Sequence, residues 1–457
     1  MQPVLWTSGF FLCILAIGYT VCALLLPLAD TARRGYIAAG LGLIINFTLL
    51  FLLPLHLSCL MIFLLGSAAL VYLLIKRKTR SRDRLKMLSF RSAMVVVFFL
   101  LILLSTLAYP IQAWDARSIW FAHSKIIFFE NSIWNGEVWS SPSMIFSHAD
   151  YPKLVSALSA QIAFGLGFWN EYFPLISIVV MVTLLFSGFA YFMTFRISSA
   201  ILIVPFLMSG DYLVNGYMDG LLALSAALCL LNIDSAADSR RPESYYSAAI
   251  GLALNPMLKN EGMLISAILA IYMIVRTKDH IWSFLLSAPR RHVTFTVILI
   301  LPIVLWSVEK ALLGLQNDLG LFSDAFLARV FLRWDEAALI PLVGEFFKVE
   351  MFTSAIGSLV VLLSINAGLR AFKKEPQSSR GFAVFALAGV FCGVMAVIYL
   401  GTPWDLAWHL NTSLDRVLLT PVSWFWIHIY YQFDEIEQRL NKWAVSASDI
   451  GKANAGS

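Results

Sequence analysis

The sequence has the composition of a membrane protein. Its 457 residues are 59% hydrophobic and only 13% charged, and its mean hydropathy is +0.78, whereas soluble domains are about one-quarter charged. These values exclude an ordinary soluble domain and predict a polytopic membrane protein. The formal net charge is only +5, and the basic residues form short clusters between apolar runs, so we expect no nucleic-acid partner.

Apolar runs recur along the chain from residue 5 to residue 433. A span needs about 20 mostly apolar residues to cross about 30 Å of hydrocarbon, where a helix satisfies its own backbone hydrogen bonds. We therefore predict an all-α, polytopic transmembrane helical bundle of about thirteen spans. The predicted spans are 5–28, 36–54, 57–75, 92–110, 172–195, 198–210, 216–234, 245–258, 262–276, 294–313, 353–369, 381–400 and 417–433.

Basic clusters set the predicted orientation, because short cytoplasmic loops hold an excess of Lys and Arg. The strongest cluster lies within 76–91. Placing all such clusters in the cytoplasm puts the N-terminus outside and the C-terminus inside. The apolar segment 153–168 would reverse this alternation if it crossed the membrane, so we expect an interfacial or re-entrant helix there, in an outer loop that also holds other interfacial helices.

The predicted topology divides the chain into four segments. They are a three-span module with a basic cytoplasmic loop (1–91), a core with an outer catalytic loop at 111–171 (92–276), C-terminal spans with outer loops at 314–352 and 401–416 (277–433), and a cytoplasmic tail (434–457). Because the first three spans contain almost no ionisable residues, we expect them to act as a scaffold.

The outer loop contains the two motifs best suited to chemistry. Asp115 and Arg117 open it, and Asp115 precedes an amphipathic segment that includes Lys125. An aspartate at a helix end is often a solvated cap, but an interfacial helix here would hold the carboxylate at the depth of a lipid headgroup. His148, Asp150 and Tyr151 close the loop; they form either a simple turn before Pro152 or contacts to a phosphate or metal.

Further ionisable residues lie at the same predicted side. Asp219 is near the hydrocarbon at the start of a span, where burial of a charge is costly. Lys259 either pairs with Glu261 or binds an anionic phosphate. Arg416 either extends its head to water from the end of the last span or forms a bidentate phosphate contact. The donor- or substrate-binding side chains that we predict are Arg117, Lys125, His148, Asp150, Tyr151, Asp219, Lys259, Glu261, His409 and Arg416.

The order and common side of these elements, from about residue 92 to residue 426, resemble the GT-C superfamily of polyprenyl-phosphate-sugar-dependent glycosyltransferases. The resemblance implies a GT-C-like fold in a bacterial cytoplasmic (inner) membrane, with the active site on the periplasmic face. It also implies a polyprenyl-phosphate sugar donor, inversion at the anomeric carbon, and Asp115 as the general base. Lys259 and Arg416 would neutralise the leaving lipid phosphate. Since no large outer C-terminal domain follows, we expect a glycan or lipid-linked acceptor rather than a protein.

Three other classes compete with this hypothesis. A transporter or flippase would use broken helices and buried charges. An O-antigen ligase or polymerase would act on a diphosphate-linked donor through an Arg-rich outer loop, and the outer segment 315–351 has only Arg329 and Arg333. A scaffold would not need several separated outer carboxylates. Oxygen ligands also suit Mg²⁺ or Mn²⁺, and Asp115 with Asp219 is the candidate pair, although no metal site is assigned.

Overall fold

The computed structural model describes residues 2–26, 31–79, 90–317, 319–321, 323–373 and 380–455, and in these ranges every regular element is a helix. The all-α prediction is therefore confirmed. Most of the predicted basic loop, residues 80–89, lies outside the described residues.

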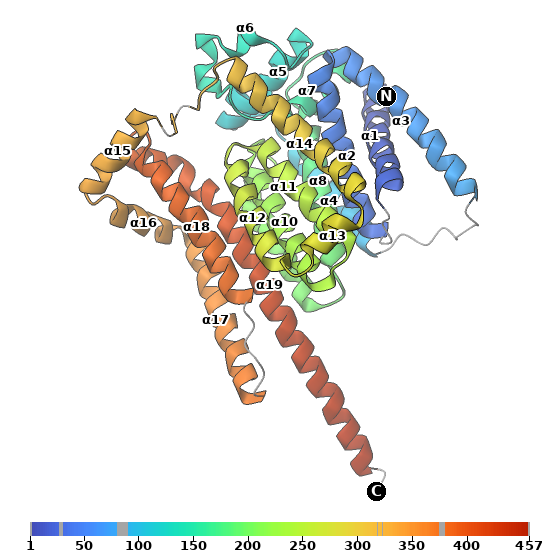
Figure 1. Cartoon of the computed structure of the whole chain (residues 1–457), viewed down its shortest axis with the longest axis vertical. Coiled ribbons are helices and arrows are strands. Elements are labelled where there is room, and N and C mark those ends of the chain that lie inside the picture. The colour runs from blue at the N-terminus through green and yellow to red at the C-terminus, as the bar shows by residue number, and fades with distance from the viewer. Residues whose placement is uncertain are drawn as a thin grey trace. The chain divides into compact units, whose positions relative to one another are not determined.

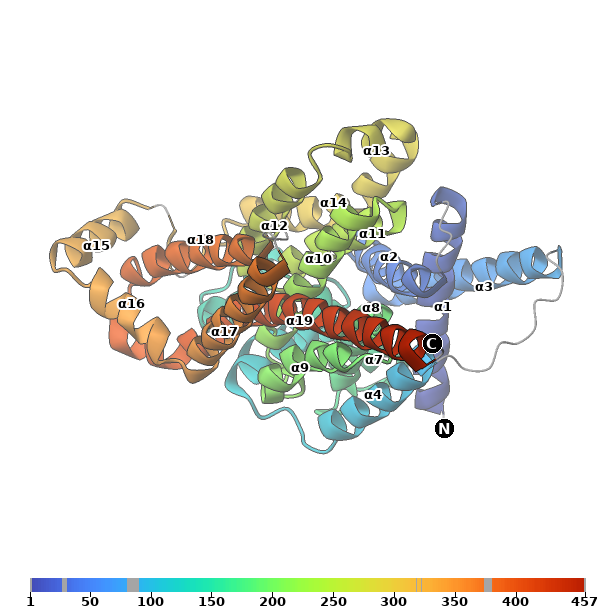
Figure 2. The same cartoon turned by 90° about the horizontal axis from the view of Figure 1, so that it is seen from below.

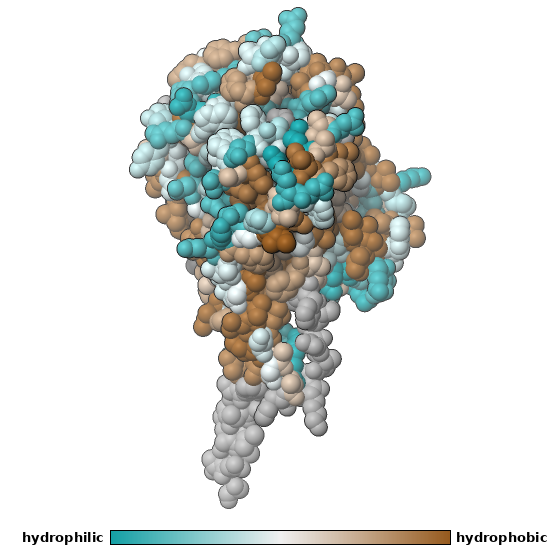
Figure 3. Space-filling model, turned by 90° about the vertical axis from the view of Figure 1, so that its left-hand side faces the viewer, coloured by the Kyte–Doolittle hydropathy of each residue, from teal (hydrophilic) through white to brown (hydrophobic). Residues whose placement is uncertain are grey.

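Nine helices of the described part are long and apolar enough to cross a membrane, which makes this a multi-pass membrane protein. They match nine of the predicted spans: Val4–Leu25, Arg33–Leu52, Leu55–Lys76, Phe90–Leu107, Phe173–Phe192, Asp219–Ser239, Pro289–Leu312, Glu350–Ala371 and Ala383–Leu400. Figure 3 shows exposed hydrophobic side chains, in brown, below the more hydrophilic upper part of the face in view.

The other four predicted spans have different forms. Segment 198–210 is not one helix but a 3-10 turn, η4 (Ile197–Ile203), followed by the short helix α9 (Val204–Ser209). Helices α11 (Pro242–Leu258) and α12 (Glu261–Thr277) have 17 residues each. Helix α19 (Leu406–Ala455) has 50 residues. It begins eleven residues before the predicted span, so most of the expected outer loop 401–416 is helical, and it continues through the expected tail.

The chain forms two compact units. Unit 1 comprises Met1–Tyr191 and Gly210–Phe326, and unit 2 comprises Phe192–Ser209 and Leu327–Ser457. In unit 1, α10 (Asp219–Ser239), α11 and α12 lie side by side (Figures 1 and 2). In unit 2, α19 packs against α17 (Glu350–Lys373) and α18 (Arg380–Leu400).

The predicted helix at 153–168 is α7 (Leu154–Leu166), and its first ten residues are all buried. It packs against α1 (Gln2–Leu25), α2 (Thr31–Leu52) and α3 (Leu55–Thr79), and on its other side against α5 (Phe121–Glu130). An interfacial helix keeps one side exposed to lipid or water. The burial of α7 on all sides fits the re-entrant alternative, and the first three helices provide its packing surface.

A pair of amide side chains links α7 to the N-terminal helices. Asn46 donates to Gln161 at 2.7 Å, and Gln161 donates back to Asn46 at 2.9 Å. Both side chains are buried. Because buried amides without partners are costly, this reciprocal pair fixes the position of α7 against α2.

Replacing Gln161 by Leu tests this link. The Gln161→Leu variant should lose about 1 to 3 kcal/mol of stability, because Asn46 keeps its buried amide without this partner. The measurement is thermal unfolding of the detergent-solubilised protein. The Asn46→Leu/Gln161→Leu double variant should lose less than the two single variants together, and Gln112→Leu, at an exposed position, is the control. A Gln161→Leu protein as stable as this control would contradict the assignment.

Candidate functional site

Asp115 begins a π-helical turn, η1 (Ala116–Trp120), at the start of the predicted outer loop. Its backbone is already helical and its side chain makes no capping hydrogen bond within the described part of the chain. The simple capping role is therefore absent. Asp115 is partly exposed while Ala116 is buried, and Arg117 is exposed. Single π-helical turns are frequent at functional sites.

Aromatic stacking joins the two motifs of this loop. The Trp120 ring, at the end of η1, stacks on Tyr151 at 5.3 Å between ring centroids, and Tyr151 stacks on His148 at 5.0 Å. Ser156 also donates a hydrogen bond to the Trp120 carbonyl at 2.7 Å. His148 has a left-handed backbone, with φ of 48°, which turns the chain sharply before Asp150. The segments around Asp115 and Asp150 are thus one packed structure.

Asp150 is the centre of a hydrogen-bond network between distant segments. Its Oδ2 accepts from Asn260 at 2.6 Å and from Asn317 at 3.4 Å, and only 5% of the residue is exposed. Burial raises the pKa of the Asp150 carboxyl, and the Asn260 hydrogen bond and neighbouring cations, Lys153 and Lys310 among them, oppose this rise. The carboxyl group therefore sits in a water-poor site with amide donors already aimed at it.

The turn between α11 and α12 places a second group of charges. Lys259 Nζ lies 2.9 Å from Asp219 Oδ1 and 3.0 Å from Glu261 Oε1. The tight turn requires Gly262, because a Cβ atom there would lie 1.9 Å from the Asn255 carbonyl oxygen. The pairing of Lys259 with Glu261 is present, and Asp219 is an additional partner that the sequence did not indicate. Two carboxylates already compensate the Lys259 charge.

Lys153 is a buried cation that the sequence did not single out. Its Nζ donates to His123 Nδ1 and to the Ala149 carbonyl, each at 2.9 Å, and lies over the rings of Trp139 (4.4 Å) and Trp306 (4.9 Å). Burial lowers the pKa of Lys153 well below its ordinary value. Burial, and then the charge of Lys153, lowers the pKa of His123 well below its ordinary value, so the imidazole is a neutral acceptor.

Glu309 is a buried carboxylate, on α14 (Pro289–Leu312). It is 1% exposed, and neither carboxyl oxygen accepts a hydrogen bond from any described residue. Lys153 is the neighbouring charge that acts on it. A carboxylate near the end of an otherwise apolar span was the available sequence signal, because an ionisable residue in a span is costly and marks a functional position by default.

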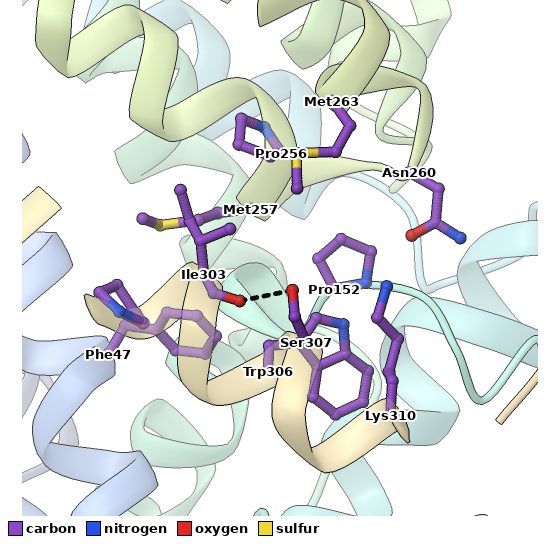
Figure 4. A pocket seen from close by; sticks show the side chains of 11 residues that line it. Phe47, Pro152, Pro256, Met257, Asn260, Met263, Ile303, Trp306, Ser307 and Lys310 are labelled. Atoms are coloured by element: carbon purple, nitrogen blue, oxygen red, sulfur yellow. Dashed lines mark hydrogen bonds between the residues drawn. The ribbon is translucent and has the colours of Figure 1, made fainter. Parts of the chain in front are cut away.

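A pocket lies beside these charges, entirely within unit 1 (Figure 4). Its enclosed space is small, about 30 Å³. Lys310 runs from α14 toward Pro152 and Asn260, while most of the wall is apolar. The pocket is lined by Phe47, Pro152, Pro256, Met257, Asn260, Met263, Pro302, Ile303, Trp306, Ser307 and Lys310. An apolar pocket with a few polar groups at one side suits an amphiphilic ligand.

The remaining predicted residues have other partners. Lys125 forms a surface ion pair with Glu171 at 2.7 Å. His409 and Arg416 belong to unit 2. His409 Nδ1 is 2.9 Å from the Thr402 hydroxyl, and Arg416 donates to the Thr412 carbonyl at 3.1 Å. In unit 1, hydrogen bonds and ion pairs therefore join the predicted side chains around Asp150, Asp219 and Lys259.

Within the described residues, no three His, Cys, Asp or Glu side chains gather as a metal site. Asp219, one of the two carboxylates considered for Mg²⁺ or Mn²⁺, binds Lys259 instead. The comparisons with family models, with curated proteins and with solved structures found no match.

Charge removal tests whether Lys153 and Glu309 compensate each other. Lys153→Met should destabilise the protein by about 1 to 3 kcal/mol, because it removes the buried donor to His123 and the Ala149 carbonyl. Glu309→Gln should also destabilise it, because it removes the opposite charge near Lys153. The double variant should recover at least about 0.5 kcal/mol relative to the sum of the single effects. Chemical unfolding in detergent measures all three, with Lys278→Met, at an exposed lysine, as the control. Strict additivity would show that the two charges act separately.

Proposed function

We propose that this protein is an inverting glycosyltransferase that moves a sugar from a polyprenyl-phosphate donor to a glycan or lipid-linked acceptor at the outer face of the membrane. The proposal rests on one observation, the apolar pocket with Lys310 and Asn260 at the side of the Asp150 network. A polyprenyl phosphate has this same division into an apolar chain and an anionic head. The GT-C resemblance of the outer motifs supports the same class.

Lys310 is the cation that we assign to the donor phosphate. It lines the pocket, whereas the Lys259 charge is shared between Asp219 and Glu261. A lysine binds phosphate as a point charge, and in a water-poor pocket this attraction is stronger than in water. Lys259 and Arg416 remain predicted contributors to phosphate neutralisation.

Asp115 is the base in this proposal. Its partial exposure lets an acceptor hydroxyl approach it, and the stacked rings of Trp120 and Tyr151 tie its segment to that of Asp150. Asp115 takes the hydroxyl proton as the acceptor oxygen attacks the anomeric carbon and the bond from that carbon to the phosphate oxygen breaks. The polyprenyl phosphate leaves with the bonding electron pair, and nearby cations stabilise its charge. Asp150, His148 and Tyr151 orient the sugar or the acceptor.

A transporter or flippase is the second candidate, and the burial of Glu309 favours it. Buried charges in spans line the substrate and ion routes of many transporters. An O-antigen ligase is less well supported, because the arginines of the outer segment 315–351 donate to backbone carbonyls at the end of α18. Arg329 contacts the Gly401 carbonyl at 2.7 Å and Arg333 contacts the Leu400 carbonyl at 2.8 Å.

The test uses purified protein in lipid nanodiscs. It is incubated with polyprenyl-phosphate sugars radiolabelled in the sugar, together with lipid-linked glycan acceptors. Transfer of label from one donor to an acceptor would support the proposal. In parallel, the same donors are placed in proteoliposomes, and movement of an intact donor across the bilayer without transfer would overturn the proposal in favour of a flippase.

Asp115→Asn should lower the transfer rate by about 10² to 10⁴-fold, because the amide cannot accept the proton. Donor affinity should stay unchanged, since Asp115 is assigned to the acceptor side. Asp211→Asn is the matched control, because Asp211 is an exposed carboxylate before the same helix as Asp219. A variant that keeps more than about a tenth of the parental rate would exclude Asp115 as the base.

Lys310→Met should weaken donor binding by about 1.5 to 3 kcal/mol, the range for a hydrogen bond to a charged group. Polyprenyl phosphate without sugar should lose the same affinity, because the contact is to the phosphate. Binding of labelled lipid to nanodiscs measures both, and Lys278→Met is the control. Unchanged affinity for both lipids would remove Lys310 from the phosphate site.

A further inference from the structure

Two short helices of the outer segment 315–351 expose apolar stripes. They are α15 (Asp324–Asp335) and α16 (Leu339–Lys348). The stripe residues follow helical spacings of i, i+4, i+7 on α15 and i, i+3, i+7 on α16, so each set lies on one face. The six residues and their exposed fractions are Leu327 41%, Phe331 65%, Trp334 56%, Ile340 80%, Val343 39% and Phe347 55%.

Helix α16 has three distinct sides. Leu342 and Phe346, four residues apart, are buried and pack toward the rest of unit 2. Glu345 and Lys348 form an ion pair at 2.5 Å on a polar side. The apolar stripe of α16 is a third side. A helix that touches protein, water and a further apolar phase needs three such sides.

The depth of α15 and α16 in the membrane follows from the ends of the spanning helices that they contact. Helix α16 ends at Lys348 and α17 begins at Glu350, so the end of α16 lies where a spanning helix starts. Arg333 on α15 donates to the carbonyls of Leu400 and Thr402, each at 2.8 Å, at the end of α18. In Figure 1, α15 and α16 lie beside these ends of α17 and α18.

We propose that α15 and α16 lie flat in the lipid–water interface and insert their six stripe residues into the outer lipid layer. Helix α16 packs on the spanning helices α17 and α18, which themselves expose apolar side chains, among them Val361 (58%) and Val390 (54%). Because exposed apolar side chains of spanning helices face lipid, we take lipid rather than a protein as the partner of the stripes. Two exposed indoles at the same end, Trp404 (48%) and Trp408 (55%), are of the type enriched in membrane interfaces. Arg333 also donates to the Trp404 carbonyl at 3.1 Å.

The charge of the two helices specifies which lipids they need. Residues 324–348 contain three basic and four acidic side chains, so they have no excess of positive charge. Attraction to anionic headgroups is therefore absent, and insertion depends on apolar burial. The same insertion is expected in neutral and in anionic membranes, independently of the glycosyltransferase activity.

Environment-sensitive fluorophores on single cysteines test the proposal in full-length protein in phosphatidylcholine nanodiscs. The stripe variants are Phe331→Cys, Ile340→Cys and Phe347→Cys. The polar controls are Glu336→Cys, just after the end of α15, and Lys348→Cys, on the polar side of α16, both at exposed positions. Native Cys392, which is partly exposed while the other four cysteines are buried, is replaced by Ala. Each variant is used only if its thermal unfolding matches that of the parent.

Nitroxide attached to the lipid near the top of the acyl chain should quench the stripe labels at least about twofold more than the controls. Aqueous iodide should quench the controls more strongly. The pattern should persist when part of the lipid is replaced by phosphatidylglycerol. Stripe labels quenched by iodide would show a solvated face, and labels shielded from both quenchers would show a protein partner or a second copy. Quenching that occurs only with anionic lipid would show that insertion depends on charge and not on burial of apolar side chains. Each of these three results would overturn the proposal.

Discussion

A charge buried inside the protein must be compensated by partners within the protein, and unit 1 is built around this constraint at Lys153, Asp150 and Lys259. Lys153 has no exposed surface, so its ammonium group needs acceptors and electron-rich rings in place of water. His123, the Ala149 carbonyl and two indoles provide them. These partners come from separate segments, and compensating one charge therefore holds the outer loop and α14 in a fixed relation.

The same constraint explains how the pocket combines opposite properties. Asp150 and Lys310 lie where segments leave the apolar core, and Asn260 and Asn317 reach Asp150 from two other segments. The wall below them consists of prolines, methionines and aromatic side chains. In the proposed reaction, the charged head of the donor would lie beside partners that are already oriented, which would reduce the reorganisation that charge separation requires.

In unit 2, the groups that need partners are backbone carbonyls rather than buried side-chain charges. The carbonyls at the end of α18 have no partners within their own helix, and Arg329 and Arg333 donate to carbonyls in this region. This use of two arginines fixes α15 against α18, and it leaves the apolar stripes of α15 and α16 turned outward. Backbone satisfaction and the exposure of the stripes are thus linked, because the arginines that donate to carbonyls at the end of α18 also set the orientation of α15.

Composition and apolar periodicity were sufficient to determine the all-helical, multi-pass character, because crossing hydrocarbon leaves the backbone few alternatives. They also located nine spans and the α7 helix. They did not identify Lys153 or Glu309, because a single charge beside an apolar run has no periodicity and its partners are distant in sequence. They misplaced the start of α19, since polar residues on one face of a helix resemble a loop when read along the chain. Only the tertiary structure decided these points, because burial and pairing are properties of side chains that packing brings together.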